Sequence, residues 1–164
     1  ERPLPGMAER GMSEVVSLLT GEPEYLDPLK DEAPNGWLVT GYPWYAIQTP
    51  EHKAFVAAYR KAFNDHPRLG SVVGYSSIKS LAAGMKKAKS TETEKMIAAF
   101  SGLQVDTPFG KITYRPEDHQ STMGGYVGRT KNEGGKGVMV DFRYVDGAKV
   151  LPPGAETKKL RPAD

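Results

Sequence analysis

The sequence predicts an α/β fold, because short apolar runs of strand length are followed by longer segments of helical periodicity. Residues 36–40 form an apolar run, residues 41–45 form an aromatic loop, and a helical segment follows. A second apolar run at 71–75 leads into another helical segment, and after Gly102 the apolar period changes to alternation. In parallel α/β sheets, ligands bind beyond the carboxyl ends of the strands, so these junctions are where we expect a site.

The composition fits one ordinary folded domain. The chain has 164 residues, 38% hydrophobic and 26% charged, which argues against general disorder. Its net charge is +2 and its basic residues are scattered, so we expect no nucleic-acid surface. No apolar run reaches the ~18 residues that a membrane span needs. The chain begins at Glu1 without a leader, so we expect its first residues to be internal to a longer sequence or the result of processing.

The residues that usually carry catalysis are sparse. Cysteine is absent, which excludes disulfides and thiolate ligands, and no Gly-x-Ser-x-Gly motif is present. The three histidines are far apart, and none has a metal-ligand partner at helical spacing. Glu117, Asp118 and His119 form the one acid–histidine cluster, for which a polar turn is the simpler interpretation. We therefore expect no metal, no cofactor and no enzymatic activity.

The first elements are predicted from caps and periodicity. Residues 14–19 are predicted to form a short helix that Ser13 caps, and residues 27–34 a turn or a single helical turn. A longer helix begins at Thr49-Pro50, where a capping residue precedes a proline at the first helical position. Its expected apolar stripe consists of Phe55, Ala58, Tyr59, Ala62 and Phe63.

Two further helices and a set of strands follow. A helix over about 76–89 is expected to bury Ile78, Leu81, Ala82 and Met85. Thr91 and Glu94 predict a capping box for the next helix, which buries Met96, Ile97 and Phe100. Strands are predicted at 111–114, 123–131 and 137–145, and a hairpin turn at 146–147 leads into 148–151. The residues from 152 onward are expected to form a loosely held tail.

Aromatic residues at the predicted junctions are the best candidates for a binding site. Trp44 and Tyr45 follow the strand at 36–40, and they either fill the core or form the wall of a ligand cleft. Gly74 and Tyr75 stand at the predicted start of the second long helix, where free backbone N–H groups of residues 74–77 are able to receive a carboxylate.

Several segments, in consistent order over residues 35–145, resemble one protein family. They are Asn-Gly-Trp-Leu-Val-Thr (35–40), the helix at 51–63, Gly-Tyr-Ser-Ser-Ile-Lys-Ser-Leu-Ala-Ala-Gly-Met (74–85) and Asp-Thr-Pro-Phe-Gly-Lys-Ile-Thr-Tyr (106–114). The family is the periplasmic solute-binding proteins of branched-chain amino acid type ABC transporters. The resemblance implies the carboxyl-terminal portion of a type I periplasmic-binding-protein fold, in which parallel sheets flanked by helices form two lobes.

The resemblance also implies a domain assignment and a function. Residues 1–36 and 121–151 would belong to the second lobe, 37–120 to the first, and 152–164 to a tail. The protein would capture a small organic solute between the lobes, namely a branched-chain or aromatic amino acid or a related acid or amide. It would deliver this solute to a membrane ABC permease from the periplasm. Trp44, Tyr45, Gly74 and Tyr75 would contact the solute, and the missing amino-terminal portion or a second copy would complete the cleft.

Two other functional classes remain open on the sequence. A cytoplasmic ligand-sensing regulator uses the same fold, and an upstream leader or DNA-binding helix pair would distinguish it from a transport protein. A small α/β enzyme is the other alternative, and it would need a pocket that contains Asp118 and His119.

Overall fold

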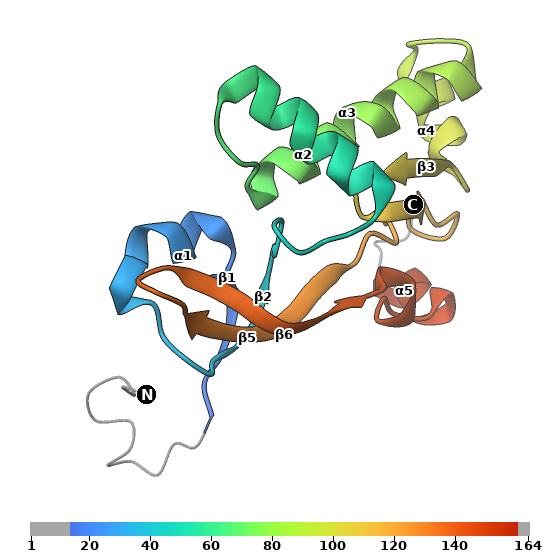
Figure 1. The fold of residues 1–164 in the computed structure, drawn as a ribbon. Helices are drawn as coiled ribbons and strands as arrows, with labels where there is room; N and C mark the ends of the chain where they lie inside the picture. The colour runs from blue at the N-terminus through green and yellow to red at the C-terminus, as the bar shows by residue number, and fades with distance from the viewer. Residues whose placement is uncertain (1–13, 161–164) are drawn as a thin grey trace.

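The computed structural model describes residues 14–160, and Figure 1 shows their arrangement. The elements alternate in type, which confirms the α/β class. Their bounds are β1 Val16–Gly21, α1 Pro23–Leu29, a 3-10 turn Lys30–Glu32, β2 Leu38–Gly41, α2 Pro50–Phe63, α3 Leu69–Ala88, α4 Thr93–Phe100, β3 Gln104–Thr107, β4 Gly110–Thr113, β5 Gly125–Asn132, β6 Gly137–Val145, a 3-10 turn Gly147–Lys149 and α5 Gly154–Leu160.

The strands form a four-stranded sheet and a separate hairpin. The order in the larger sheet is β1-β2-β5-β6, where β1 runs parallel to β2 and the other pairs are antiparallel. Strands β3 and β4 pair only with each other. Figure 1 shows α1 beside the larger sheet, and α2, α3 and α4 grouped with the hairpin. The chain therefore has two structural groups, and the segments after β2 and before β5 connect them.

One hydrophobic core joins the two groups. Val39, Tyr126 and Met139 of the larger sheet pack with Phe55 of α2 and Val72 of α3. Burying a side chain of this size stabilises the fold by about 1.5–3 kcal/mol, so these contacts hold the groups together. A smaller cluster of Leu103, Val105 and Ile112 lies on the hairpin, with Phe100 of α4 packed against it.

The predicted strands at 123–131 and 137–145 are confirmed as β5 and β6. Tyr126, Gly128 and Thr130 are buried and alternate along β5 with residues of greater exposure. This alternation is the period-two pattern from which the strand was predicted. The hairpin predicted at 146–147 is wrong, because a 3-10 turn at Gly147–Lys149 follows β6 and leads to α5.

The helix predicted at 14–19 is also wrong, because β1 occupies Val16–Gly21. Val16, Leu18 and Leu19 have helical spacing, but all three are at least half exposed in the strand. Pairing with β2, about 20 residues further along the chain, overrides the local pattern. Ser13, the predicted cap, lies outside the described residues.

Helix α3 buries a different face from the predicted one. It begins at Leu69, so the apolar run at 71–75 is helical and is not a strand. Its buried residues are Val72, Ser76, Ser80 and Gly84, at a spacing of four. The residues that were expected inside are instead exposed, at 67% for Ile78, 42% for Leu81 and 37% for Met85. Small side chains allow α4 and β3 to approach closely, which hydrophobicity alone does not predict.

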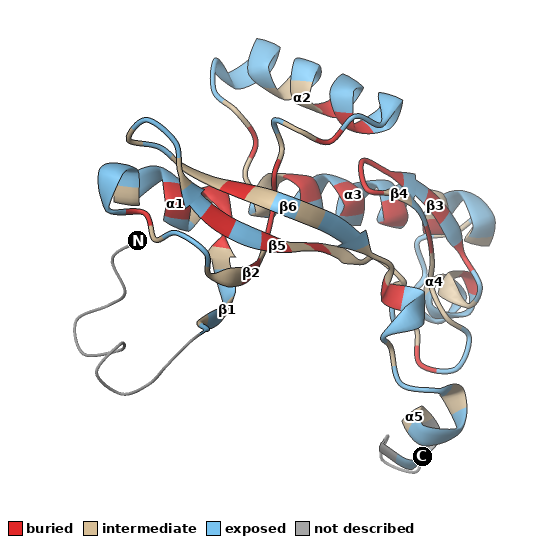
Figure 2. Cartoon of the chain, turned by 60° about the horizontal axis from the view of Figure 1, so that its bottom comes forward, coloured by how far each residue is buried: buried red, intermediate tan, exposed pale blue. Residues whose placement is uncertain are grey.

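The other two helices differ in detail from the prediction. Helix α2 begins at Pro50 as predicted, but Phe55 is the one buried member of its expected stripe, and Phe63 is 65% exposed. The side chain of Thr49 makes no cap hydrogen bond to the helix. Helix α4 is capped by Glu92, whose carboxylate accepts from the N–H of Glu94, and not by Thr91. Figure 2 shows α2 mostly exposed and α3 with regularly spaced buried residues. Within residues 14–160, no helix is long and apolar enough to cross a membrane.

Candidate functional site

The carboxyl ends of β1 and β2 meet at two glycines. Gly21 pairs with Gly41. A Cβ on Gly21 would lie 2.5 Å from the carbonyl oxygen of Thr40, and a Cβ on Gly41 would overlap the carbonyl of Gly21. Only glycine permits this approach, which places the loops after both strands next to each other. A ligand site is expected at such strand ends.

A cavity of about 390 Å³ opens at this place, between the sheet and α3. Its walls come from both structural groups of the fold. They consist of Glu22, Thr40, Gly41, Leu69, Val73, Ser76, Ser77, Phe109, Ile112, Tyr114, Ser121, Met123, Gly124, Gly125 and Tyr126. None of these lining residues is basic, and Glu22 is the one acidic residue among them.

Glu22 is the most distinctive group in this cavity. It is 8% exposed, and burial raises the pKa of its carboxyl, with a smaller contribution from the neighbouring charge of Glu24. Among residues 14–160, its carboxylate makes no hydrogen bond. The oxygens of Glu22 are not among the fully buried side-chain atoms without a partner, so they retain some accessible surface in the cavity that the residue lines. A ligand that brings an ammonium or N–H group would supply a donor to them.

The rest of the cavity offers aromatic surface and acceptor oxygens. Tyr126 and Phe109 meet edge to face with their ring centroids 5.4 Å apart. Burial raises the pKa of Tyr126 to about 12, so its hydroxyl is neutral at physiological pH. The hydroxyls of Ser76 and Ser77 donate to the carbonyls of Val72 and Val73, at 2.8 and 3.0 Å, which leaves their lone pairs for a ligand's donor.

Trp44 and Tyr45 line a second cavity, of about 500 Å³, between α1 and the β5–β6 loop. The Trp44 indole is stacked on the His66 ring, with a centroid distance of 4.7 Å and an interplanar angle of 11°. The Tyr45 hydroxyl donates to the carbonyl of Met139 at 2.9 Å and accepts from its N–H at 2.7 Å. The donor hydrogen and one lone pair of this hydroxyl are therefore taken by β6. The solute-binding role of these two residues stays a prediction.

Gly74 and Tyr75 do not lie at a helix start, because α3 begins at Leu69. The backbone N–H groups of residues 74–77 are therefore within the helix, and the expectation that they are free to receive a carboxylate is wrong. Tyr75 packs on Phe55 at 5.0 Å and lines a third cavity, of about 250 Å³, with Lys79. Gly74 is exposed and lines none of the cavities described. The four predicted residues are thus not brought together at one site.

The acid–histidine cluster is part of a loop. Asp118 is an ion-pair partner of Arg115, and its carboxylate also accepts from the N–H of Gln120 at 3.0 Å. His119 has a positive φ of 57°. Within the described part of the chain, no group of three His, Asp or Glu side chains is placed to hold a metal ion.

The sequence-based prediction did not include Glu22. The residue directly follows the carboxyl end of β1, which is where a site is expected in such a fold. A helix at 14–19 would place no strand end there, so the mistaken helix prediction hid this junction. A strand assignment for 16–21 would have been the signal.

Comparison with known proteins gives a consistent family. The profile of the periplasmic binding protein family matches residues 4–136. The structure is similar to an ABC-type branched-chain amino acid transporter from Rhodopseudomonas palustris CGA009, with 28% identity, a TM-score of 0.72 and coverage of 91% of this chain. It is also similar to an ABC transporter solute-binding protein from Rhodopseudomonas palustris BisB5 in complex with 3,4-dihydroxybenzoic acid, with 26% identity, a TM-score of 0.68 and 86% coverage.

A third similarity concerns the fold alone. The leucine-, isoleucine-, valine-, threonine- and alanine-binding protein from Brucella ovis is 18% identical, with a TM-score of 0.71 over 90% of this chain. The chain covers 42%, 40% and 40% of the three solved proteins, so it corresponds to about two fifths of their length. Comparison with curated proteins gave no match. The matched profile spans most of the sequence, and the chain belongs to the periplasmic binding protein family.

Proposed function

We propose that this chain is part of the periplasmic solute-binding component of an ABC importer. Its family membership and its similarity to solved importer components support this role. The component captures a small organic solute, passes it to a membrane ABC permease and catalyses no reaction. Solute capture then occurs by closure of two lobes. The solute stabilises the closed state because it binds that state more tightly than the open state.

We assign the two structural groups to the two lobes. The larger sheet with α1 is part of one lobe, and α2, α3 and α4 with the β3–β4 hairpin are part of the other. Strand β2 pairs with both β1 and β5, which supports a crossing after Gly41. The 390 Å³ cavity then lies between the lobes, since its walls come from both groups. Its remaining walls come from the missing amino-terminal portion or from a second copy.

The solute that best fits this cavity is an amino acid with an apolar side chain. Glu22 carries this assignment, because its carboxylate makes no hydrogen bond within residues 14–160 and an ammonium group would complete it. Phe109, Ile112 and Tyr126 supply apolar surface for the side chain. An aromatic acid is the second candidate, favoured by the 26% identical protein that was solved with 3,4-dihydroxybenzoic acid.

Nuclear magnetic resonance of the 17.9 kDa chain is a suitable test, because it detects weak binding to a partial site. Leucine, phenylalanine and 3,4-dihydroxybenzoate are titrated separately into the ¹⁵N-labelled chain. We expect an amino acid to shift the amide signals of the residues that line the 390 Å³ cavity. Dissociation constants are then compared for the native chain, Glu22→Gln and Glu32→Gln, the last an exposed carboxylate outside the cavity.

The two solute classes predict opposite results for Glu22→Gln. If the solute is an amino acid, the variant weakens binding at least tenfold while Glu32→Gln has no effect, since a charge-assisted hydrogen bond contributes about 1.5–3 kcal/mol. If the solute is an aromatic acid, removing the negative charge strengthens binding. No signal change with any of the three compounds at millimolar concentration would contradict this location of the solute site.

A further inference from the structure

The 500 Å³ cavity differs from the candidate solute cavity in the charges that line it. Its volume lies within the range of about 300–1,000 Å³ that is typical of small-molecule sites. It is lined by two basic residues, Lys30 at the end of α1 and Lys136 between β5 and β6. The 390 Å³ cavity is lined by Glu22 and by no basic residue. The two cavities share no lining residue, so they are separate candidate sites.

Asn132, the last residue of β5, holds the two basic segments together. Its side-chain nitrogen donates to the carbonyl of Lys30 at 3.0 Å, and its side-chain oxygen accepts from the N–H of Gly135 at 3.1 Å. Two backbone hydrogen bonds between Glu133 and Lys136, of 2.8 and 3.2 Å, close the turn between β5 and β6. The end of α1 and this turn therefore form one fixed edge of the cavity.

Three side-chain donors at this cavity have no acceptor. The ammonium groups of Lys30 and Lys136 form no ion pair or hydrogen bond with another described residue. The indole N–H of Trp44 likewise has no acceptor among residues 14–160. This nitrogen is not one of the fully buried polar atoms without a partner, so it keeps accessible surface. A ligand with acceptor oxygens would complete all three donors.

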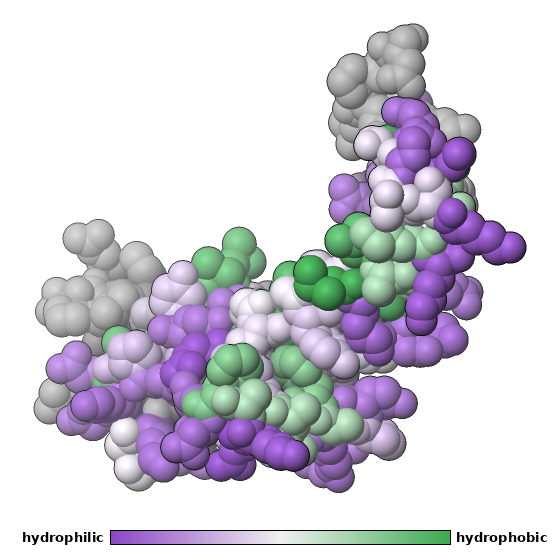
Figure 3. Space-filling model, turned by 90° about the horizontal axis from the view of Figure 1, so that it is seen from above, coloured by the Kyte–Doolittle hydropathy of each residue, from purple (hydrophilic) through white to green (hydrophobic). Residues whose placement is uncertain are grey.

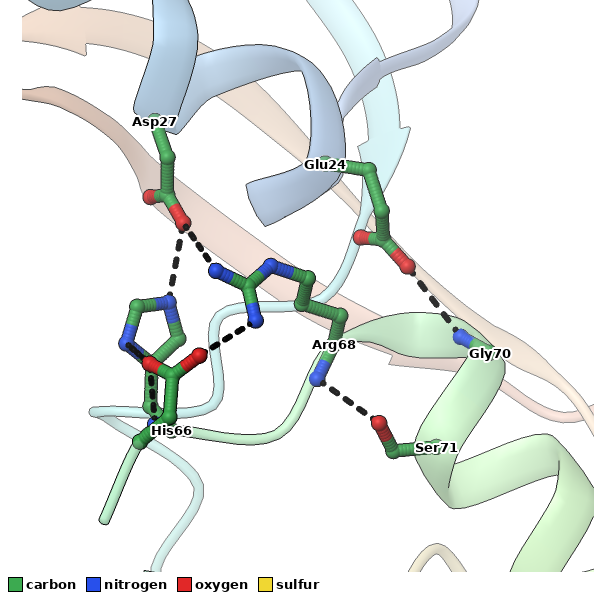
Figure 4. Close-up of polar contacts among 7 residues, drawn as sticks. Glu24, Asp27, His66, Arg68, Gly70 and Ser71 are labelled. Carbon is green, nitrogen blue, oxygen red and sulfur yellow. Dashed lines mark hydrogen bonds and ion pairs between the residues drawn. The ribbon is translucent and has the colours of Figure 1, made fainter. Parts of the chain in front are cut away.

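The acidic groups beside the cavity are already paired with other cations. Asp27 is the one acidic residue that lines it, and Figure 4 shows the Asp27 carboxylate pointing toward His66 and Arg68. Its Oδ2 lies 2.9 Å from His66 Nε2 and 3.8 Å from an Arg68 guanidinium nitrogen. Glu133, in the turn between β5 and β6, lies 2.9 Å from the ammonium nitrogen of Lys131. The two unpaired lysines therefore remain available to an anion.

Aromatic side chains supply apolar wall surface. Trp44 and Tyr45 meet edge to face, with their ring centroids 5.8 Å apart. The stacked His66 ring fixes the orientation of the indole, and Tyr45 is 44% exposed. Leu26 and Tyr42 are buried behind them and line the same cavity. A planar ring suits these walls, because aromatic pairs contribute more than the area that they bury.

We propose that the 500 Å³ cavity is a second binding site, which takes an aromatic carboxylate. The carboxylate accepts from the indole N–H of Trp44 and from the ammonium groups of Lys30 and Lys136, and the ring of the ligand packs on Tyr45. A carboxylate is ionised at neutral pH, and its hydrogen bonds to charged donors are about twice as strong as neutral ones. This site does not rest on the proposed function, because it uses no residue of the solute cavity.

Nuclear magnetic resonance of the ¹⁵N-labelled chain tests the site with three matched probes. Benzoate has a ring and a charge, benzamide has the ring alone, and acetate has the charge alone. The two indole N–H signals of the chain, from Trp37 and Trp44, are assigned with the variant Trp37→Phe. We expect benzoate to shift the Trp44 indole signal and the amide signals of Gly135 and Gly137. Benzamide and acetate should bind at least about fivefold more weakly, because each lacks one of the two kinds of contact.

Variants assign the binding to the three donors. Lys30→Gln and Lys136→Gln should each weaken benzoate binding about two- to fivefold, since contacts between exposed charges are individually modest. The control is Lys53→Gln, at an exposed lysine of α2 that lines none of the described cavities, and it should leave binding unchanged. Trp44→Phe keeps an aromatic ring and removes the donor, so it should also weaken benzoate binding.

Several results would overturn the second site. They are the absence of any shift with benzoate, equal binding of benzoate and benzamide, and equal effects of the three lysine variants. Benzoate shifts confined to the residues that line the 390 Å³ cavity would overturn it as well. Glu22→Gln separates this site from the proposed function, because benzoate binding at the 500 Å³ cavity should be unchanged in that variant. Failure of the second site would leave amino-acid binding at the solute cavity unaffected.

Discussion

A single side chain, Glu22, combines a stability cost with the chemistry expected of a solute contact. It is buried in the cavity, and among the described residues no hydrogen-bond donor reaches its carboxylate. Groups that are poorly satisfied in the empty protein are common at binding sites, because the ligand provides the missing partner. A glutamate at position 22 is therefore explained by solute binding, because another residue there would give a more stable fold.

Replacing Glu22 with glutamine should stabilise the empty chain at neutral pH. The folded-state pKa of Glu22 lies above its unfolded value, so its protonated form contributes stability below about pH 4.5, and that contribution is lost as the pH rises. At pH 7 the variant avoids a buried charge, and we expect a gain on the order of 1 kcal/mol in the free energy of unfolding. Urea unfolding of the native chain and of Glu22→Gln at pH 7 and pH 4 measures this difference in unfolding free energy. The gain should be smaller at pH 4.

The control for this measurement is Glu32→Gln, because Glu32 is exposed and lines none of the described cavities. Its unfolding free energy should stay within about 0.5 kcal/mol of the native value. A destabilised Glu22→Gln would mean that the carboxylate has a stabilising partner in the folded chain, and the assignment of an ammonium-bearing solute would lose its basis.

Individual site residues were only partly predictable from the sequence. Trp44 and Tyr45 do line a cavity, but the contacts of Trp44 with His66 and of Tyr45 with Met139 are long-range and have no sequence pattern. Glu22 was missed because its chemical environment depends on burial between two groups of elements. Residue type alone does not report such burial.

Among the elements, α3 shows most clearly what periodicity does and does not determine. Its helical character was predicted from about residue 76, although the helix begins at Leu69. The buried face was mispredicted, because Ser76, Ser80 and Gly84 are small or polar and Ile78 and Leu81 are large and apolar. A hydrophobic stripe on a helix predicts that another part of the protein packs against it. Nothing within residues 14–160 covers Ile78, whose side chain is 67% exposed.

Two glycines of α3 provide a matched test of this burial pattern. A Cβ on Gly74 would meet open space, whereas a Cβ on Gly84 would lie 2.6 Å from the Phe100 ring and 3.1 Å from Met96 of α4. We expect Gly74→Ala to stabilise the chain by about 0.5–1 kcal/mol, because alanine loses less backbone entropy in a helix. Gly84→Ala should destabilise it by about 1–3 kcal/mol through overpacking against α4.

Thermal and urea unfolding of the two variants distinguish these effects, since the substitution and the helix are the same. Stabilisation by both would mean that α4 yields easily at Phe100. Destabilisation by Gly74→Ala would mean that another surface approaches Gly74 in solution.

At the scale of the whole molecule, the chain's family and α/β class were predictable, and the arrangement of its surfaces was not. The order of motifs along residues 35–145 resembled one family, and the family profile confirms it over residues 4–136. The sequence does not reveal which apolar faces are covered by this chain itself. Strand β1 stands at the end of the sheet order, and Leu18 on it is 73% exposed. Figure 3 shows hydrophobic side chains gathered at the surface.

These apolar faces predict self-association of the 164-residue chain. An edge strand with apolar side chains presents both unpaired backbone groups and hydrophobic surface to a second copy. We expect sedimentation velocity to give an apparent mass that rises above 17.9 kDa with concentration. Leu18→Lys should reduce the association, because a charge on an edge strand opposes pairing. Val150→Lys is the control, since Val150 is 66% exposed but lies outside the strands and the main helices.

The two variants separate a specific edge from general stickiness. If association runs through β1, Leu18→Lys lowers it and Val150→Lys leaves it unchanged, although both changes add the same charge. Equal effects of both would attribute association to net charge and surface hydrophobicity as a whole. A monomer at every concentration would contradict association through β1 and would show that this edge is tolerated in water.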